Sequence, residues 1–160
     1  MHFRPMFMYL LVLFMFQLVP SLSAAETAAA DLEQAMSDTL DLWREGRYEQ
    51  LYERLSHRGK TSKEKFVARM RGTSIRPSCC WQKMENFKVL NEKLTEATVY
   101  AKIGLDGTSN PSESVTREFK LSHDHGAWKM YLNDVNDLAG ITGKKAKKPS
   151  RRKSIKVLSP

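Results

Sequence analysis

The chain lacks most of the short motifs from which an enzymatic activity can be recognised in a sequence. Its eight glycines form no phosphate-binding loop, no residue stands in a nucleophile motif, and no segment is repeated. His123 and His125 flank Asp124 but run into a turn, and no third metal ligand stands at a recognisable spacing. We therefore expect no metal and no cofactor. On the predicted strands, Glu85 and Asp134 are the only candidates for a catalytic base.

The first 25 residues have the three parts of a secretory signal peptide. Arg4 provides the positive start, Met6–Val19 forms an almost entirely apolar run, and small residues lead to an expected cleavage after Ala24 or Ala25. The run has 14 residues, whereas a membrane-spanning helix needs about 20, which argues against an uncleaved anchor. No cysteine follows the cleavage region, so we do not expect a lipoprotein. The sequence predicts export to the periplasm or the medium.

The net charge of +8 is not spread evenly over the chain. Residues 26–143 contain 17 Lys and Arg against 18 Asp and Glu, whereas the segment that follows contains no acid. We therefore expect one folded domain over 26–140 and a disordered basic tail over 141–160. The tail either only solubilises the protein or binds an anionic lipid or polymer; we do not expect nucleic acid as the partner of an exported chain. Its eight basic residues are Lys144, Lys145, Lys147, Lys148, Arg151, Arg152, Lys153 and Lys156.

Three amphipathic helices are predicted in the N-terminal half of the domain. Apolar residues recur at helical spacing over 31–46, which ends at a glycine suited to a C-terminal cap, and again over 47–56. A third helix over 61–70 opens with a capping box, in which Thr61 is the cap and Glu64 lies three residues later. Three short helices cannot bury their apolar faces on one another alone, so we expect a sheet beneath them.

The C-terminal half predicts that sheet. Apolar and polar residues alternate over 97–105, 115–121 and 128–133, and residues 81–90 form a less regular strand with Phe87 and Val89 on its inner face. Sequential strands joined by short links form an antiparallel meander. We therefore predict an α+β fold, with about three N-terminal helices packed on an antiparallel sheet of four or more strands.

The helices carrying LWREGRYEQLYERLS and SKEKFVARM, followed by long strands of which the last reads HGAWKMYLNDV, resemble a known group. They are similar to small exported members of the nuclear-transport-factor-2-like, or ketosteroid-isomerase-like, superfamily. The resemblance covers about residues 31–136. It implies a cone-shaped fold, in which a strongly curved sheet and the helices enclose a pocket. The tyrosine and aspartates that the isomerases of this superfamily use have no evident counterparts in this sequence.

Arg117 is the most informative candidate for a site residue. It has the strand phase of Val115, Phe119 and Leu121 and therefore points to the apolar side of the sheet, where an unpaired charge is costly. Either it pairs with a carboxylate, or it reaches water at the mouth of the cone, or it contacts an anionic ligand; we favour the mouth.

A ligand pocket would also need aromatic walls. Such residues at helical or strand spacing form plain core at least as readily. The candidate pocket consists of Tyr48, Tyr52, Trp81, Arg117 and Trp128.

Cys79 and Cys80 are the only cysteines and are neighbours. Adjacent Cα atoms lie about 3.8 Å apart, whereas disulfides usually span about 4.4–6.8 Å, and neighbouring side chains of a strand point to opposite faces. We therefore expect that they are not bonded to each other in most molecules, with Cys79 buried and Cys80 exposed. An intermolecular disulfide and a bridge between the two with a redox role are the alternatives.

The absence of a nominated base favours binding over catalysis. We expect an exported, non-catalytic domain that binds a small ligand or a partner protein in the cell envelope, with a homodimer left open. The alternative is a small isomerase or dehydratase of ketosteroid-isomerase type, which would need a cavity with a desolvated carboxyl group or histidine. A third hypothesis treats the domain as the carrier of a membrane-active tail, as in cystatin-fold precursors of antimicrobial peptides, which it resembles only weakly.

Overall fold

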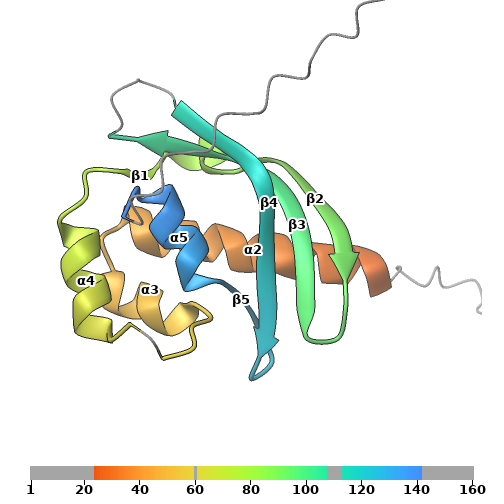
Figure 1. Ribbon diagram of the computed structural model, residues 1–160. Coiled ribbons are helices and arrows are strands. Elements are labelled where there is room, and N and C mark those ends of the chain that lie inside the picture. The colour runs from red at the N-terminus through yellow and green to blue at the C-terminus, as the bar shows by residue number, and fades with distance from the viewer. Residues whose placement is uncertain (1–23, 60, 108–112, 142–160) are drawn as a thin grey trace, which may run out of the picture.

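The computed structural model describes residues 24–59, 61–107 and 113–141. Within these residues, four α-helices pack on one antiparallel sheet of five strands, which curls strongly and stays open, as a half-barrel does (Figure 1). The predicted α+β class is confirmed. The apolar run of the predicted signal peptide and the basic residues of the tail lie outside the described residues, among which no helix is long and apolar enough to span a membrane.

The longest helix, α2 (Ala24–Arg44), crosses the hollow of the sheet (Figure 1). Its predicted apolar stripe is fully buried, and the chain leaves it through Gly46, whose φ of +74° is the left-handed conformation expected after a helix. Two shorter helices follow, α3 (Tyr48–Arg54) and α4 (Lys63–Arg71), as the sequence predicts.

The start of α4 differs from the prediction by one residue. Ser62, not Thr61, is the N-cap, and its hydroxyl accepts a hydrogen bond from the backbone N–H of Lys65 at 3.4 Å. Thr61 instead offers its backbone carbonyl to the hydroxyl of Tyr52, at 2.7 Å. Two adjacent hydroxyl residues can both serve as a cap, and this tertiary contact of Thr61 decides between them.

The centre of the sheet is β3 (Glu96–Asp106). One of its edges pairs first with β2 (Glu85–Glu92) and then with the short β1 (Arg76–Pro77), which the sequence did not predict. Its other edge pairs over ten residues with β4 (Glu113–Asp124). A two-residue turn then leads to β5 (Ala127–Met130), which covers only the last four residues of β4.

Both ends of the predicted strand set need correction. Residues Cys80–Lys83 form the short 3₁₀ helix η1 ahead of β2, so Trp81 is not on a strand. The last strand ends at Met130, and Leu132–Leu138 form helix α5, which the alternation did not predict. The reason is a second periodicity: Leu132 also starts a helical set with Val135 and Leu138, and all three are buried.

Apolar side chains fill the space between the sheet and the helices. They come from all four helices and from β3, β4 and β5, and the largest are almost inaccessible to solvent, among them Trp43, Phe66 and Phe119. Phe87 and Val89 of β2 pack on this core, as predicted. The hollow of the sheet, where the resemblance implies a pocket, is therefore occupied by the core.

Candidate functional site

The candidate site is a cleft of about 610 Å³ beside β4. The link between α3 and α4, the edge of β4, and the start of α5 surround it and lie together on the side of β4 away from β2 (Figure 1), and Glu96 at the start of β3 also contributes to its lining. Its walls are mostly polar, with both signs of charge. The lining residues are Ser56, His57, Arg58, Thr61, Glu96, Glu118, Lys120, Tyr131, Leu132, Asn133 and Asp134.

The cleft exists because β5 is short. After Met130 the chain passes to the α3–α4 link instead of following β4: the N–H of Ser56 donates to the carbonyl of Met130 at 2.8 Å. The N–H of Leu132 then donates to the carbonyl of Ser56 at 3.0 Å, and α5 begins. Among the described residues, no strand pairs with this side of β4 from Glu113 to Lys120.

The free edge of β4 presents backbone groups at alternate residues. In the tight hairpin, Asp124 lies opposite Ala127, so the backbone groups of the even-numbered residues of β4 point toward β5. Farther along the strand, the groups of Thr116 and Glu118 point to the same side, where none of the strands that the structure describes pairs with them. The N–H of Lys120 is satisfied by the carboxylate of Asp134.

Arg117 and Asp134 form the polar centre of the α5–β4 contact. The guanidinium group lies 3.0 Å from the carboxylate of Asp134 and donates to the backbone carbonyl of the same residue at 3.3 Å. It also lies 4.0 Å from the carboxylate of Asp137, and 4.8 Å from the centre of the Phe119 ring. Of the three arrangements considered for Arg117, the structure contains the pairing with a carboxylate.

The carboxyl group of Asp134 is the most perturbed acid of the cleft. Burial raises its pKa above the ordinary value of 3.8, because desolvation penalises the charged form more than Arg117 and the N–H of Lys120 favour it. Its side chain is only 18% exposed. A carboxyl group with a raised pKa at the wall of a cleft is a recognised mark of a functional site, although burial of a carboxyl group with a purely structural role produces the same shift.

Aromatic side chains support the α3–α4 wall of the cleft. The Tyr52 ring lies against His57, with ring centroids 4.2 Å apart, and against Phe66 of the core. The hydroxyl of Tyr52 donates to Thr61 and thereby ties the end of α3 to the start of α4. Across the cleft, the hydroxyl of Tyr131 donates to Glu96 at 3.4 Å.

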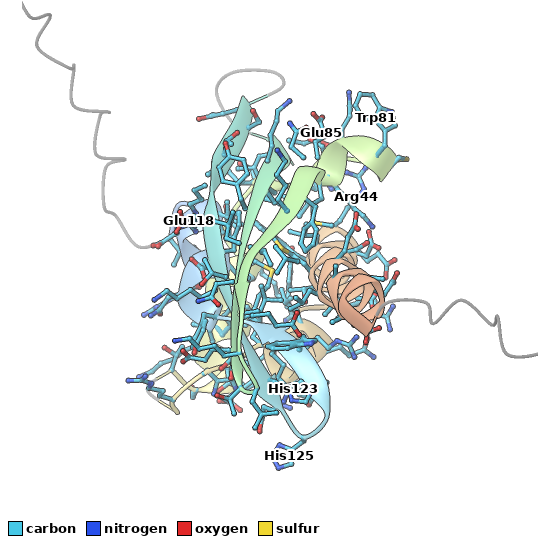
Figure 2. All side chains as sticks on the ribbon, turned by 90° about the vertical axis from the view of Figure 1, so that its right-hand side faces the viewer. Arg44, Trp81, Glu85, Glu118, His123 and His125 are labelled. Carbon is cyan, nitrogen blue, oxygen red and sulfur yellow. A yellow bond between two sulfur atoms is a disulfide. The ribbon has the colours of Figure 1, made fainter. Side chains whose placement is uncertain are left out.

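The five residues of the predicted pocket do not converge on one cavity. Tyr52 and Arg117 do not line the cleft themselves but contact two residues that do, Thr61 and Asp134. Tyr48 packs on the core. Trp128 lies against His123, with ring centroids 4.8 Å apart. Figure 2 shows Trp81 and His123 at opposite ends of the molecule, and Trp81 is 72% exposed.

The structure joins Cys79 and Cys80 by a disulfide, contrary to the prediction that they are not bonded to each other. Both residues are exposed, so the expected burial of Cys79 is also wrong. The prediction assumed an extended strand with alternating side chains. Instead, Cys79 is extended (φ −73°, ψ 150°) and Cys80 is left-handed (φ 59°), which turns both sulfur atoms to the same side.

Of the two histidines, His125 lies in the β4–β5 turn that the sequence indicates, whereas His123 is still on β4, opposite Trp128. His125 and Gly126 have φ values of 50° and 77°, and the carboxylate of Asp124 lies 2.7 Å from Nδ1 of His125. Within the described ranges, no group of three potential ligands is placed to hold a metal ion.

The sequence points to Asp134 as a candidate but not to its place in α5, and it contains no sign of the α3–α4 link as a wall of the cleft. The alternation pattern places Asp134 on a strand, whereas it lies in α5, and the helical spacing of Leu132, Val135 and Leu138 was the available signal for that helix.

No family model matches the chain, and no curated protein matches it. The fold therefore defines the class of architecture, an α+β half-barrel compatible with the nuclear-transport-factor-2-like fold.

Proposed function

We propose that the chain is an exported, non-catalytic binding domain of the nuclear-transport-factor-2-like superfamily, and that its cleft binds an extended segment of a partner protein. The observation that carries this proposal is the free edge of β4 along the 610 Å³ cleft. Backbone N–H and C=O groups of Thr116 and Glu118 point to that edge. An extended peptide can satisfy such groups by adding a strand to the sheet.

The walls of the cleft suit a polar segment. Arg58 and Lys120 contribute positive charge, and Glu96 and Glu118 contribute negative charge. Asp134 already holds the N–H of Lys120, so an added strand would pair from Glu118, which lines the cleft, and would leave the cleft along Thr116 toward Glu113. The buried apolar side chains that the described residues place between sheet and helices argue against a small ligand inside the half-barrel.

The test uses proline at the free edge. The N–H of residue 118 points away from β3, so Glu118→Pro removes an edge donor without removing a bond of the β3–β4 ladder. Glu118→Ala is the matched control. Peptides of random sequence displayed on phage would be selected on the purified protein, and their affinities measured for both variants.

We expect the selected peptides to bind Glu118→Pro about tenfold more weakly than Glu118→Ala, because both variants lack the carboxylate and only the first also lacks the backbone donor. Both variants should show unchanged circular dichroism. Equal affinities for the two variants would remove the edge from the site, and a selection without enriched peptides would count against peptide binding altogether.

A second function, a small isomerase or dehydratase of ketosteroid-isomerase type, is favoured by one observation. Burial raises the pKa of Asp134 at the wall of the cleft, which is the direction of shift that a carboxylate general base at neutral pH needs. The carboxylate is, however, already engaged by Arg117 and by Lys120. Turnover of a β,γ-unsaturated ketone that is lost in Asp134→Asn would establish this activity in place of the first proposal.

The proposal also includes export of the chain and a binding role for its basic tail. The apolar N-terminal run supports a cleaved signal peptide, and N-terminal sequencing of the exported protein should begin near Ala25 or Glu26. Recovery of the intact N-terminus in a membrane fraction would contradict this. The eight basic residues after Gly143 would hold the domain near an anionic lipid or polymer of the envelope.

A further inference from the structure

The segment Ser78–Trp81 forms a surface of its own, away from the cleft. Cys79 and Cys80 are joined by a disulfide, and both are exposed. The next side chain, Trp81, is 72% exposed and projects from η1 at the end of the molecule where Arg44 and Glu85 also lie (Figure 2). An accessible disulfide beside a solvent-exposed indole ring serves neither the core nor the proposed binding function.

The chain is held firmly on the N-terminal side of this segment. Ser78 is buried, and its N–H donates to the carbonyl of Gly104 at 2.9 Å. Its hydroxyl donates to Asp106 at 2.7 Å, and the guanidinium of Arg44 donates to the carbonyl of Pro77 at 2.7 Å. These contacts do not involve the disulfide and should persist without it.

The chain is held equally on the C-terminal side. The ammonium group of Lys83 donates to the carboxylate of Asp41, and the Lys83 side chain is only 19% exposed. The carbonyl of Gln82 lies so close to Gly104 that a Cβ there would approach it to 2.4 Å. Cys79, Cys80 and Trp81 lie between these contacts, and the N–H of Gln82 donates to the carbonyl of Cys79 at 3.2 Å, which leaves Cys80 and Trp81 as the residues able to change position.

The disulfide and the backbone of Cys80 depend on each other. Neighbouring side chains of an extended chain point to opposite sides, so both sulfur atoms meet only when one of the two residues leaves the extended conformation. Cys80 does so, with φ 59°, a conformation that is unfavourable for residues other than glycine. Once the disulfide is open, it no longer holds Cys80 in this conformation. The backbone of Cys80 can then move to a more favourable φ, which displaces Trp81.

We propose that Cys79 and Cys80 form a thiol-exchange site for small thiols, and that its opening repositions Trp81. A thiolate attacks one of the two sulfur atoms, a mixed disulfide forms, and the other cysteine leaves as a thiolate. A second thiol attacks the mixed disulfide and releases the small-molecule disulfide. Two thiols thus lose two electrons and two protons, and the protein gains two cysteine thiols. The small-molecule disulfide reverses the reaction by the same steps.

Opening this bond should leave the fold intact. A disulfide stabilises a protein mainly by closing a loop of the unfolded chain, and its effect grows with the length of that loop. Here no residue lies between the two cysteines, so the constraint on the unfolded chain is minimal. Exposure of both residues gives a thiol direct access to the sulfur atoms, on which exchange depends.

The test exposes the purified protein to mixtures of reduced and oxidised glutathione. Free thiols are counted with a chromogenic reagent, before and after reduction, and tryptophan fluorescence is recorded on the native protein. We expect no free thiol at first and two per chain after reduction, with a fluorescence change that oxidised glutathione reverses. The melting temperature should stay nearly unchanged.

Variants separate the site from its surroundings. Trp81→Phe should abolish the fluorescence change, whereas Trp128→Phe, at the other end of the molecule, should retain it. Cys80→Ser should give one free thiol, which can form only a mixed disulfide with glutathione, and its fluorescence should not change when reduced glutathione is added. Two free thiols before any reduction would overturn the proposal, as would a bond that glutathione opens only after denaturation. A large drop in melting temperature on reduction, or a fluorescence change that persists in Trp81→Phe, would also overturn it.

Discussion

Removal of the Arg117 charge tests how the cleft is held together. In Arg117→Met, the apolar part of the side chain can still cover Phe119, while the partner of Asp134 is lost. Removing one member of a fully buried ion pair costs about 3–5 kcal/mol, and an exposed pair contributes less than about 1 kcal/mol. The two side chains are 33% and 18% exposed. We therefore expect a loss of about 2 kcal/mol in the free energy of unfolding at pH 7.

Urea denaturation, monitored by circular dichroism, measures this loss in the free energy of unfolding. Two further variants serve as controls. Arg71→Met removes the cation of a far more exposed pair with Glu49 and should change stability by less than about 0.5 kcal/mol. The double variant Arg117→Met/Asp134→Asn should be more stable than Arg117→Met alone, because the uncompensated carboxylate is removed together with its partner.

The pH dependence provides an independent check. A carboxyl group whose pKa is raised in the folded state contributes stability below its unfolded pKa, and this contribution is lost as the pH rises through the folded pKa. Loss of Arg117, which lowers the pKa of Asp134, should raise that pKa further. The deficit of Arg117→Met should therefore shrink as the pH falls from 7 toward 4. A deficit independent of pH, or no larger than that of Arg71→Met, would refute the proposed role of the pair.

Three further predictions concern other parts of the chain. Ser62→Ala should lower the stability by about 1 kcal/mol, and Thr61→Ala by clearly less, because only the Ser62 hydroxyl caps α4; equal losses in thermal melts would contradict the assignment. Gly104→Ala should cost about 1–3 kcal/mol, since its Cβ would meet the carbonyl of Gln82 at 2.4 Å, and an unchanged urea midpoint would show that the loop yields. Truncation after Gly143 should leave the melting temperature unchanged and abolish binding to anionic vesicles at low salt, where screening is weak; equal binding by both forms would place the binding surface on the domain.

Local periodicity determined most of the fold in advance. The apolar side of β3 could be read directly, because alternation with a period of two reports which side chains face the core, and Ala97–Leu105 are buried at every second position as predicted. The same reasoning found the stripe of α2 and the inward phase of Arg117. These features depend on residues close together in the chain, so the sequence carries the whole signal.

Features that depend on distant contacts were decided only by the tertiary structure. Leu132 satisfies both a strand and a helical period, and the pairing of Ser56 with the chain around Met130 and Leu132 is what ends the strand and starts α5. The left-handed conformation of Cys80 likewise accompanies its disulfide with Cys79, in a segment held at Ser78 and Gln82 by contacts with β3 that the neighbouring sequence does not encode. The cleft exists because β5 departs early from β4, and this departure is set by contacts between segments about 75 residues apart.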